Sequence, residues 1–238
     1  MSVHSQRVLI IGGTSGIGLA VAASVAERGA TPIVASRRAS SVERALASLP
    51  SVAVGATVDL ADPNSIETLA EQVGDVDHLV YTAGEPLQMV PLAELSPELI
   101  TGFYQTRFVG ACSVARVFGP RLPVGGSITL TSGSASEQPE FGVLPVSLCG
   151  AMNALTTALA VELAPVRVNA VAPGMVRSPL WDTMAEADRD TMFSEAAQRI
   201  PLGRIGTVEE VARAYLYCIE QPYATGAVIK VDGGSVLR

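Results

Sequence analysis

Short, continuously apolar runs alternate with longer helix-like segments along the whole chain. The apolar runs predict strands at 8–11, 31–35, 52–58, 78–81, 127–130, 166–171 and 227–231. The intervening segments predict helices at 17–28, 41–49, 64–73, 96–118, 144–163, 180–198 and 207–219. Strands that are apolar at nearly every residue are typical of parallel sheets, which are buried on both faces. The alternation therefore predicts an α/β fold, a parallel sheet of about seven strands with helices on both faces.

A glycine-rich turn follows the first predicted strand. Gly12, Gly16 and Gly18 lie between the apolar run and a helix-like segment. A strand, a glycine turn and a helix N-terminus together form an anion site, because the first helical N–H groups are unpaired and the helix dipole is positive there. Glycine is also the usual residue of plain tight turns. On its own the turn leaves both interpretations open.

Composition and charge exclude several classes of function. With 238 residues, of which 48% are hydrophobic, the chain is long enough for one α/β domain over 1–238. The net charge is −7 and Lys230 is the only lysine, which disfavours nucleic acid and anionic membranes as partners. The three cysteines have no paired spacing, so we expect no metal site and a reducing compartment. We expect a cytoplasmic protein, since the first apolar run is too short for a signal peptide or a membrane span.

The loop after the second strand bears on cofactor choice. It reads Ser36, Arg37 and Arg38. In a dinucleotide site, an acidic residue here accepts the ribose 2′-hydroxyl, whereas arginine pairs with a 2′-phosphate. The arginines favour NADP(H) over NAD(H), although a solvated basic loop gives the same sequence.

At this point the chain resembles the short-chain dehydrogenase/reductase family over essentially its whole length. The motifs that carry the resemblance are the glycine turn at 11–18, the pair at 59–60, the triplet at 82–84, the segment at 167–174, and the closing motifs at 225–226 and 232–234. The resemblance implies a Rossmann-like doubly wound fold that binds a nicotinamide dinucleotide. Members usually transfer hydride between this cofactor and a carbonyl or alcohol.

The resemblance, with the loops above, gives a set of expected cofactor contacts. These residues are Gly12, Thr14, Ser15, Gly16, Ile17, Gly18, Ser36, Arg37, Arg38, Asp59, Leu60, Thr82, Ala83, Gly84, Pro173, Gly174 and Val176.

The catalytic side chains of the family match this chain less well. The family uses a helix asparagine, a serine after the fifth strand, and a Tyr-x-x-x-Lys pair. Ser132 matches the serine, but Pro145 and Cys149 stand where the pair is expected, and Arg107 replaces the asparagine. Proline donates no proton, and the pKa of arginine is too high for it to act as the acid. We take Ser132 and Arg107 as candidate catalytic residues. Arg107 either supports the nicotinamide ribose in place of the lysine or forms an ordinary ion pair.

Three functions remain open on this basis. The first is an NADP-dependent oxidoreductase acting on a carbonyl, an alcohol or an activated small molecule, with an altered proton donor. The second is a non-redox enzyme of the dehydratase or isomerase type, and the third is an inactive cofactor-binding protein. Loss of a general acid slows a reaction by about 10²–10⁴-fold, which an activated substrate tolerates. This favours the oxidoreductase.

The resemblance also gives expectations for substrate and assembly. The segment at 175–199 corresponds to a lid over the substrate in the family. Leu180, Trp181 and Phe193 in this segment suggest an apolar substrate, although they equally suit the core face of a helix. Members are usually homodimers or homotetramers, and the apolar helices predicted at 96–118 and 144–163 favour the same assembly here.

Overall fold

A parallel sheet forms the centre of the molecule. The computed structural model describes residues 2–85 and 90–237. The sheet has seven strands, in the order β3-β2-β1-β4-β5-β6-β9, and every pairing is parallel. Their bounds are β1 Arg7–Ile11, β2 Thr31–Ser36, β3 Val54–Thr57, β4 His78–Tyr81, β5 Ser127–Thr131, β6 Arg167–Pro173 and β9 Val228–Val231. The order reverses between β1 and β4, which puts the ligand crevice of such a fold beside the carboxyl ends of these two strands.

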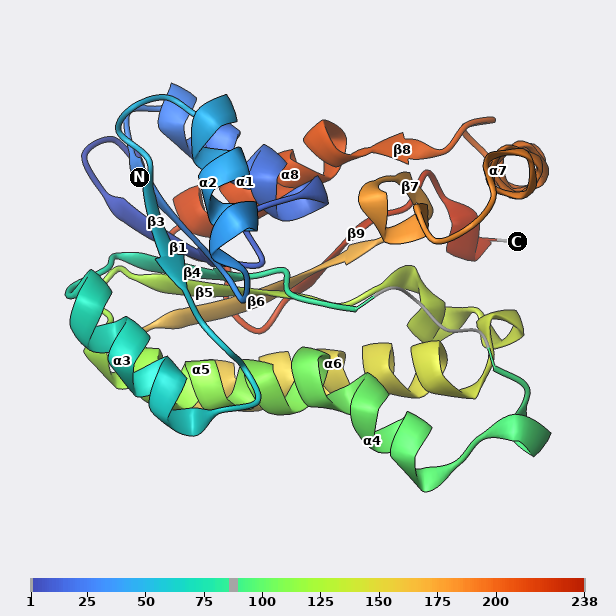
Figure 1. Ribbon diagram of the computed structural model, residues 1–238, viewed down its shortest axis with the longest axis horizontal. Coiled ribbons are helices and arrows are strands. Elements are labelled where there is room, and N and C mark those ends of the chain that lie inside the picture. The colour runs from blue at the N-terminus through green and yellow to red at the C-terminus, as the bar shows by residue number, and fades with distance from the viewer. Residues whose placement is uncertain (1, 86–89, 238) are drawn as a thin grey trace.

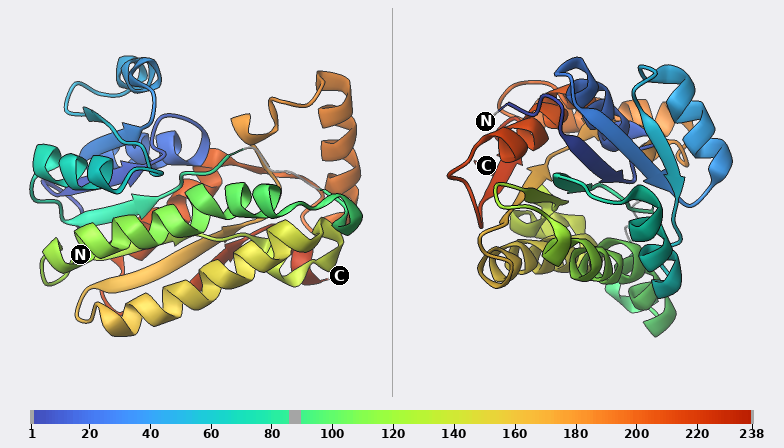
Figure 2. Two further views of the ribbon diagram at one scale, coloured as in Figure 1. Left: turned by 60° about the horizontal axis from the view of Figure 1, so that its bottom comes forward. Right: turned by 90° about the vertical axis from the view of Figure 1, so that its left-hand side faces the viewer.

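Helices cover both faces of the sheet (Figures 1 and 2). One layer contains α1 Gly16–Glu27, α2 Ala39–Ser48 and α8 Val208–Glu220. The opposite layer contains α3 Pro63–Val73, α4 Pro97–Tyr104, α5 Gly110–Phe118 and α6 Val143–Glu162. The expected α/β architecture with a doubly wound parallel sheet is thereby confirmed.

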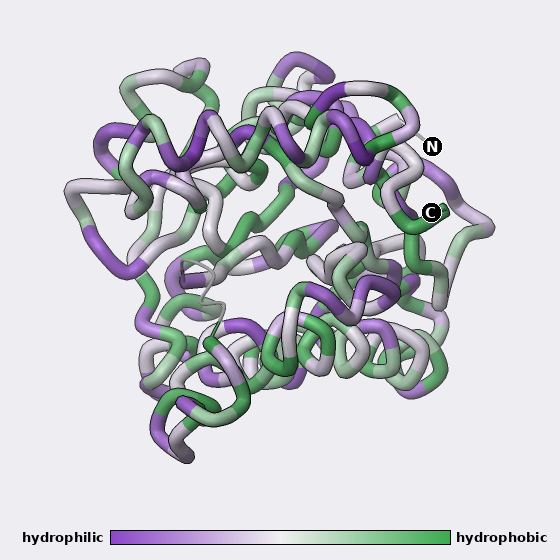
Figure 3. Tube along the Cα trace, turned by 90° about the vertical axis from the view of Figure 1, so that its right-hand side faces the viewer, coloured by the Kyte–Doolittle hydropathy of each residue, from purple (hydrophilic) through white to green (hydrophobic). Residues whose placement is uncertain are grey.

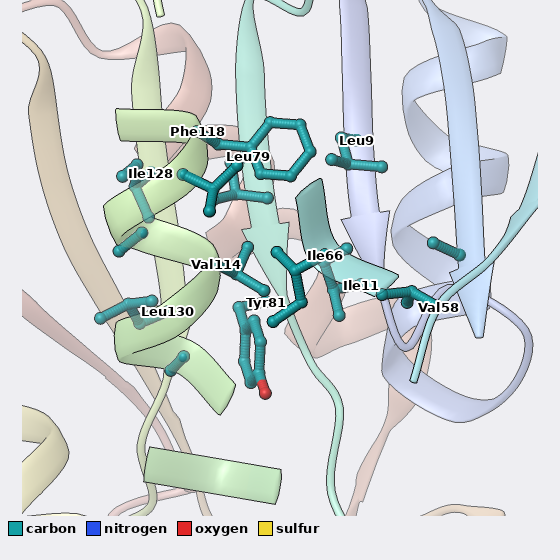
Figure 4. Packing of buried hydrophobic residues seen from close by; sticks show 14 of the residues in the cluster. Leu9, Ile11, Val58, Ile66, Leu79, Tyr81, Val114, Phe118, Ile128 and Leu130 are labelled. Carbon is teal, nitrogen blue, oxygen red and sulfur yellow. The ribbon is translucent and has the colours of Figure 1, made fainter. Parts of the chain in front are cut away.

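Each face of the sheet has its own hydrophobic core. Alternate residues of one strand point to opposite faces, so Leu9 and Ile11 lie in one cluster while Val8 and Ile10 lie in the other. Figure 4 shows part of the first cluster, where side chains of β1, β4 and β5 meet those of α3 and α5. The hydrophobic residues follow the central strands, as the green segments of Figure 3 show. Burial on both faces explains why the strands read as continuous apolar runs.

Three predicted elements differ from the structure. The single helix expected at 96–118 is two helices separated by η2, a π-helical turn at Gln105–Val109. The helix expected at 180–198 begins later: a 3₁₀ turn, η6 Pro179–Trp181, precedes α7 Glu186–Arg199. A two-stranded ribbon, β7 Val176–Arg177 with β8 Gly206–Thr207, was not expected. Two-residue strands are too short to leave a period in the sequence.

The helix α6 is apolar over its whole length. Among the described residues, it is the one helix long and apolar enough to cross a membrane by length and composition. A third of its apolar window is buried inside the molecule, where α6 packs against β6. A core helix that is also apolar on its outer face satisfies the same criterion.

Candidate functional site

The glycine turn brings β1, α1 and the end of β4 into close contact. Gly12 and Gly16 have φ of +86° and +51°, the left-handed region that favours glycine. A Cβ on Gly12 would lie 2.6 Å from the backbone nitrogen of Ala83, and one on Gly18 would lie 2.5 Å from Thr82 Oγ1. Side chains at these positions would push the turn away from the strand. The glycines are therefore required by the packing, independently of any ligand.

The N-terminus of α1 has no side-chain cap at this turn. Ser15 is the N-cap residue and is exposed, but its side chain makes no capping hydrogen bond, and no acidic residue lies in the first turn. The first N–H groups of a helix have no partner within the helix and carry the positive end of its dipole. The described residues here thus form a cradle that fits a diphosphate. Thr14 and Ile17 lie half-buried beside it.

The adenosine side of the expected cofactor site lies at the ends of β2 and β3. Ser36 ends β2, and the side chains of Arg37 and Arg38 are exposed just beyond it. Asp59 is also exposed, and its Oδ1 accepts from the backbone nitrogen of Ala61 at 3.0 Å. Leu60 packs against the core beside it. The arginines thus border the same edge of the sheet as the glycine turn.

The nicotinamide side is bounded by the ends of β4 and β6. Thr82 Oγ1 donates to the carbonyl of Ile11 at 3.1 Å, which ties the end of β4 to β1. Gly174 follows β6, and a Cβ there would lie 2.7 Å from the Cα of Asp232. The side chain of Val176 packs in the hydrophobic core. The remaining expected contacts therefore lie together around the carboxyl ends of β1, β4 and β6.

Ser132 lies directly after β5 in a polar network with α6. Its hydroxyl donates to Asn153 Oδ1 at 2.6 Å and approaches the carbonyl of Cys149 at 3.1 Å. Asn153 Nδ2 donates to Ser136 Oγ at 3.2 Å. The sequence analysis did not identify Asn153. Its spacing of four residues from Cys149, one helical turn, was the available signal.

Pro145 and Cys149 lie one helical turn apart on α6. Pro145 is buried near the start of the helix. The Sγ of Cys149 would lie 2.9 Å from a Cβ on Gly133, next to Ser132. Burial raises the pKa of the Cys149 thiol to about 11, although the nearby Arg107 charge lowers it. Cys149 is therefore a neutral thiol at pH 7.

Arg107 projects from η2 toward the end of β4. Its Nη2 donates to the carbonyl of Glu85, and its guanidinium carbon lies 5.0 Å from the centre of the Phe103 ring. A Cβ on Gly84 would lie 3.1 Å from the same carbon. Burial lowers the pKa of Arg107, while Glu85 and Cys149 raise it. The guanidinium thus packs against Gly84, near enough to Cys149 to influence its pKa.

One nitrogen of this guanidinium has no partner. Arg107 Nη1 is buried and makes no hydrogen bond with residues 2–85 or 90–237. A buried donor that is left without a hydrogen bond costs about 1–3 kcal/mol, and more when the group is charged. Such an atom fits a ligand oxygen that completes the site.

The expected lid region covers the glycine turn. A Cβ on Gly16 would lie 3.5 Å from the side chain of Pro179 and 3.8 Å from that of Ser178. Trp181 is buried: its Nε1 donates to the carbonyl of Val176 at 3.0 Å, and its ring meets Phe193 edge-on. Both aromatic rings belong to the internal packing of the lid segment, rather than to an exposed apolar surface.

Comparisons with known proteins agree with this geometry. A family model described as enoyl-(acyl carrier protein) reductase matches residues 12–236. The chain is 34% identical to the short-chain dehydrogenase/reductase malC of Malbranchea aurantiaca, over 99% of this chain and 96% of malC. The structure of the MalC reductase/Diels-Alderase superposes with a TM-score of 0.91, covering 99% of this chain and 98% of that one.

Two further solved structures are similar. A small-chain dehydrogenase in complex with NADPH is 30% identical, with a TM-score of 0.84 and coverage of 98% of this chain and 100% of that one. An NADPH-bound short-chain oxidoreductase from Pseudomonas aeruginosa PAO1, which contains an atypical catalytic centre, is 29% identical. Its TM-score is 0.89, with 96% of both chains covered.

Proposed function

This chain belongs to the short-chain dehydrogenase/reductase family, and we propose that it is an NADP(H)-dependent oxidoreductase with an altered proton donor. Its substrates are carbonyls, alcohols or activated small molecules. The observation that carries the proposal is the buried Nη1 of Arg107, which has no partner among the described residues, on a guanidinium that packs against Gly84 at the end of β4.

The cofactor assignment rests on the fit of the residues present. The close packing of Gly12 and Gly18 and the uncapped N-terminus of α1 suit a diphosphate. The exposed Arg37 and Arg38 suit a 2′-phosphate, because guanidinium groups pair with phosphate in a bidentate manner. NADPH complexes of two similar structures support the choice of NADP(H).

The reaction centre differs from the usual family pattern in its proton chemistry. When bound, NADPH supplies the hydride. We propose that Pro145 and Cys149 occupy the places of the family's Tyr-x-x-x-Lys pair, so that the neutral thiol supplies no cation. Arg107 provides the positive charge instead and donates from Nη1 to an oxygen of the ribose or substrate. Ser132 is held by Asn153 and orients the substrate.

This arrangement favours substrates that need little acid catalysis. The pKa of an arginine is too high for it to transfer a proton efficiently at neutral pH. The proton must then come from water or from the substrate itself. An electrophile that already carries positive charge needs no proton from the enzyme, whereas an ordinary ketone does.

The proposal is tested by cofactor titration followed by turnover. Nicotinamide fluorescence is recorded during titration with NADPH and NADH, and NADPH consumption is then followed with simple ketones and with cationic C=N compounds. We expect tighter binding of NADPH, and faster turnover of the cationic electrophiles. Failure to bind either cofactor would remove the oxidoreductase assignment.

A non-redox activity is the second candidate, because the similar MalC protein is both a reductase and a Diels-Alderase. A Diels-Alder reaction consumes no hydride, so the same pocket could shape a substrate without oxidising or reducing it. Binding of NADPH without consumption over the whole panel favours this alternative, or an inactive cofactor-binding protein.

The assembly and lid remain part of this proposal. We propose a cytoplasmic homodimer or homotetramer that associates through the exposed side of α6, where Val143 and Val161 are 46% and 78% exposed. The segment 175–199 acts as the lid over a small-molecule substrate. Sedimentation of the purified protein tests the assembly, and a monomer at micromolar concentration would contradict it.

A further inference from the structure

The π-helical turn η2 interrupts the helix that carries Arg107. The backbone N–H of Gly110 donates to the carbonyl of Gln105, five residues earlier. The extra residue in this turn changes the direction of side chains by about 100° relative to an uninterrupted α-helix. Such turns are rare, and in this chain η2 receives a hydrogen bond from outside the helix.

Tyr81 provides that contact from the sheet. It is the last residue of β4 and is 1% exposed, and its hydroxyl donates to the carbonyl of Thr106 within η2. Figure 4 shows the hydroxyl pointing out of the hydrophobic cluster that surrounds the ring. Burial raises the pKa of Tyr81 well above its ordinary value, so the hydroxyl keeps its proton and remains a donor.

Gly110 provides the space for this hydroxyl. A Cβ on Gly110 would lie 2.5 Å from the Tyr81 oxygen. Glycine inside a helix costs about 1 kcal/mol relative to alanine. Its presence at the end of η2 therefore matches the need to admit the tyrosine.

We propose that Tyr81 is a positioning residue: its hydrogen bond to Thr106 holds the π-helical turn that directs the Arg107 guanidinium against Gly84. This inference rests on the proposed role of Arg107 in the function above. Tyr81 itself acts only through the backbone of η2, because its hydroxyl is already used by the Thr106 carbonyl.

The first test reads the location of Arg107 without any cofactor. The Arg107 charge lowers the pKa of the Cys149 thiol, so removing or displacing this charge reduces the thiolate fraction at a given pH. Alkylation of Cys149 by iodoacetamide is followed from pH 8 to pH 10 by peptide mass spectrometry, which separates Cys149 from Cys112 and Cys218. Arg107→Met, which keeps an apolar stem, gives the reference for loss of the charge.

We expect Tyr81→Phe and Arg107→Met to slow this alkylation to a similar extent, by about tenfold for a pKa increase of one unit. Tyr215→Phe is the matched control. Tyr215 is also fully buried, and its hydroxyl bonds Thr131 Oγ1 at 2.6 Å, but it does not contact η2. An unchanged rate in Tyr81→Phe, or a similar decrease in Tyr215→Phe, would overturn the inference.

Gly110→Ala is the second variant, for use if Tyr81→Phe folds poorly as judged by circular dichroism. It retains the tyrosine but displaces its hydroxyl, so we expect the same slower alkylation of Cys149. Wild-type behaviour of folded Gly110→Ala would contradict the proposed contact.

The second test uses NADPH affinity. We expect Tyr81→Phe to weaken NADPH binding by about tenfold in the wild type, but by less than about twofold in the Arg107→Met background. Equal effects in both backgrounds would contradict the coupling. If wild-type protein binds no NADPH, the proposed function fails, while the alkylation assay still tests Tyr81.

Discussion

Two arginines lie at opposite ends of the parallel strands: one at the amino edge, where the strands begin, and one at the carboxyl edge, where they end. Their guanidinium groups find hydrogen-bond partners in different ways. Arg167 begins β6 at the amino edge and is 8% exposed. Its two terminal nitrogens donate to the carbonyls of Cys218 and Ile219, at 2.6 and 2.7 Å. These carbonyls lie in the last turn of α8. Carbonyls in the last turn of a helix have no hydrogen-bond partner within the helix and carry the negative end of its dipole. The fold alone therefore satisfies Arg167.

Arg107 lies at the carboxyl edge, and one of its terminal nitrogens has no hydrogen-bond partner among the described residues. Its Nη2 has the Glu85 carbonyl, but Nη1 has no partner in the part of the chain that the structure describes. Thr129 Oγ1, inside the sheet, is also buried and unpaired, so an orphaned atom does not identify a site by itself. The difference is location: the Arg107 guanidinium packs against Gly84 at the end of β4, which adjoins the glycine turn. On our proposal, the amino edge is completed by the fold and the carboxyl edge by a ligand.

Arg167→Met gives the largest expected effect. It leaves the last carbonyls of α8 without their buried donors, which we expect to lower the free energy of unfolding by about 4 kcal/mol. Urea denaturation monitored by circular dichroism measures this loss. NADPH affinity of the folded variant should remain at the wild-type level. A loss below about 1 kcal/mol would mean that Arg167 is not the structural counterpart of Arg107.

His78 gives a second test of the amino edge. It is buried between Ser127 Oγ at 2.8 Å and Gln6 Oε1 at 3.1 Å, and burial followed by the Arg167 charge lowers its pKa to about 4. The unfolded chain binds the proton first, near pH 6.5, so stability decreases as the pH falls from about 6.5 to 4. The shift corresponds to about 3 kcal/mol.

The measurement compares unfolding free energies of wild type and His78→Gln across this range of pH. The subtraction removes contributions from carboxylates that titrate in both proteins. We expect the difference between the two proteins to change by about 3 kcal/mol between pH 7 and pH 4. Parallel profiles would mean that His78 is not held in the neutral form.

A smaller effect is expected at the adenosine side of the carboxyl edge. Arg37→Ala should weaken NADPH by about tenfold and leave NADH nearly unchanged, because only NADPH has a 2′-phosphate. Arg44→Ala is the matched control, since this exposed arginine of α2 bonds only Ser41 Oγ among the contacts described. Fluorescence titration measures both affinities. Equal weakening of the two cofactors would contradict the assignment to NADP(H).

The sequence predicted the strands well because their signal is local. The run at 78–81, for example, matches β4 His78–Tyr81 at both ends. The helix predicted at 207–219 likewise matches α8 Val208–Glu220, which Thr207 and Glu210 begin with a capping box. The glycine turn was ambiguous alone, because its function depends on the ends of distant strands.

What the sequence did not reveal depends on contacts between distant segments. The π-helical turn accepts a hydrogen bond from the Tyr81 hydroxyl, which lies 25 residues before Thr106 in the sequence. The helix expected from residue 180 fails because Trp181 is fixed to the carbonyl of Val176 before α7 begins. Asn153 lies in an apolar helix, where its contacts with Ser132 and Ser136 distinguish it from a solvent-facing amide.

The comparison of the two edges is tested most directly by ligand-induced stabilisation of Arg107→Met. At an NADPH concentration of about 100 times the wild-type Kd, the wild-type unfolding free energy should rise by about 2.7 kcal/mol. Without ligand, Arg107→Met should cost less than about 1 kcal/mol, because it removes an incompletely paired buried charge. With the same NADPH, it should gain only about 1.4 kcal/mol, corresponding to tenfold weaker binding. Equal stabilisation of the two proteins by NADPH, or none in the wild type, would contradict the account.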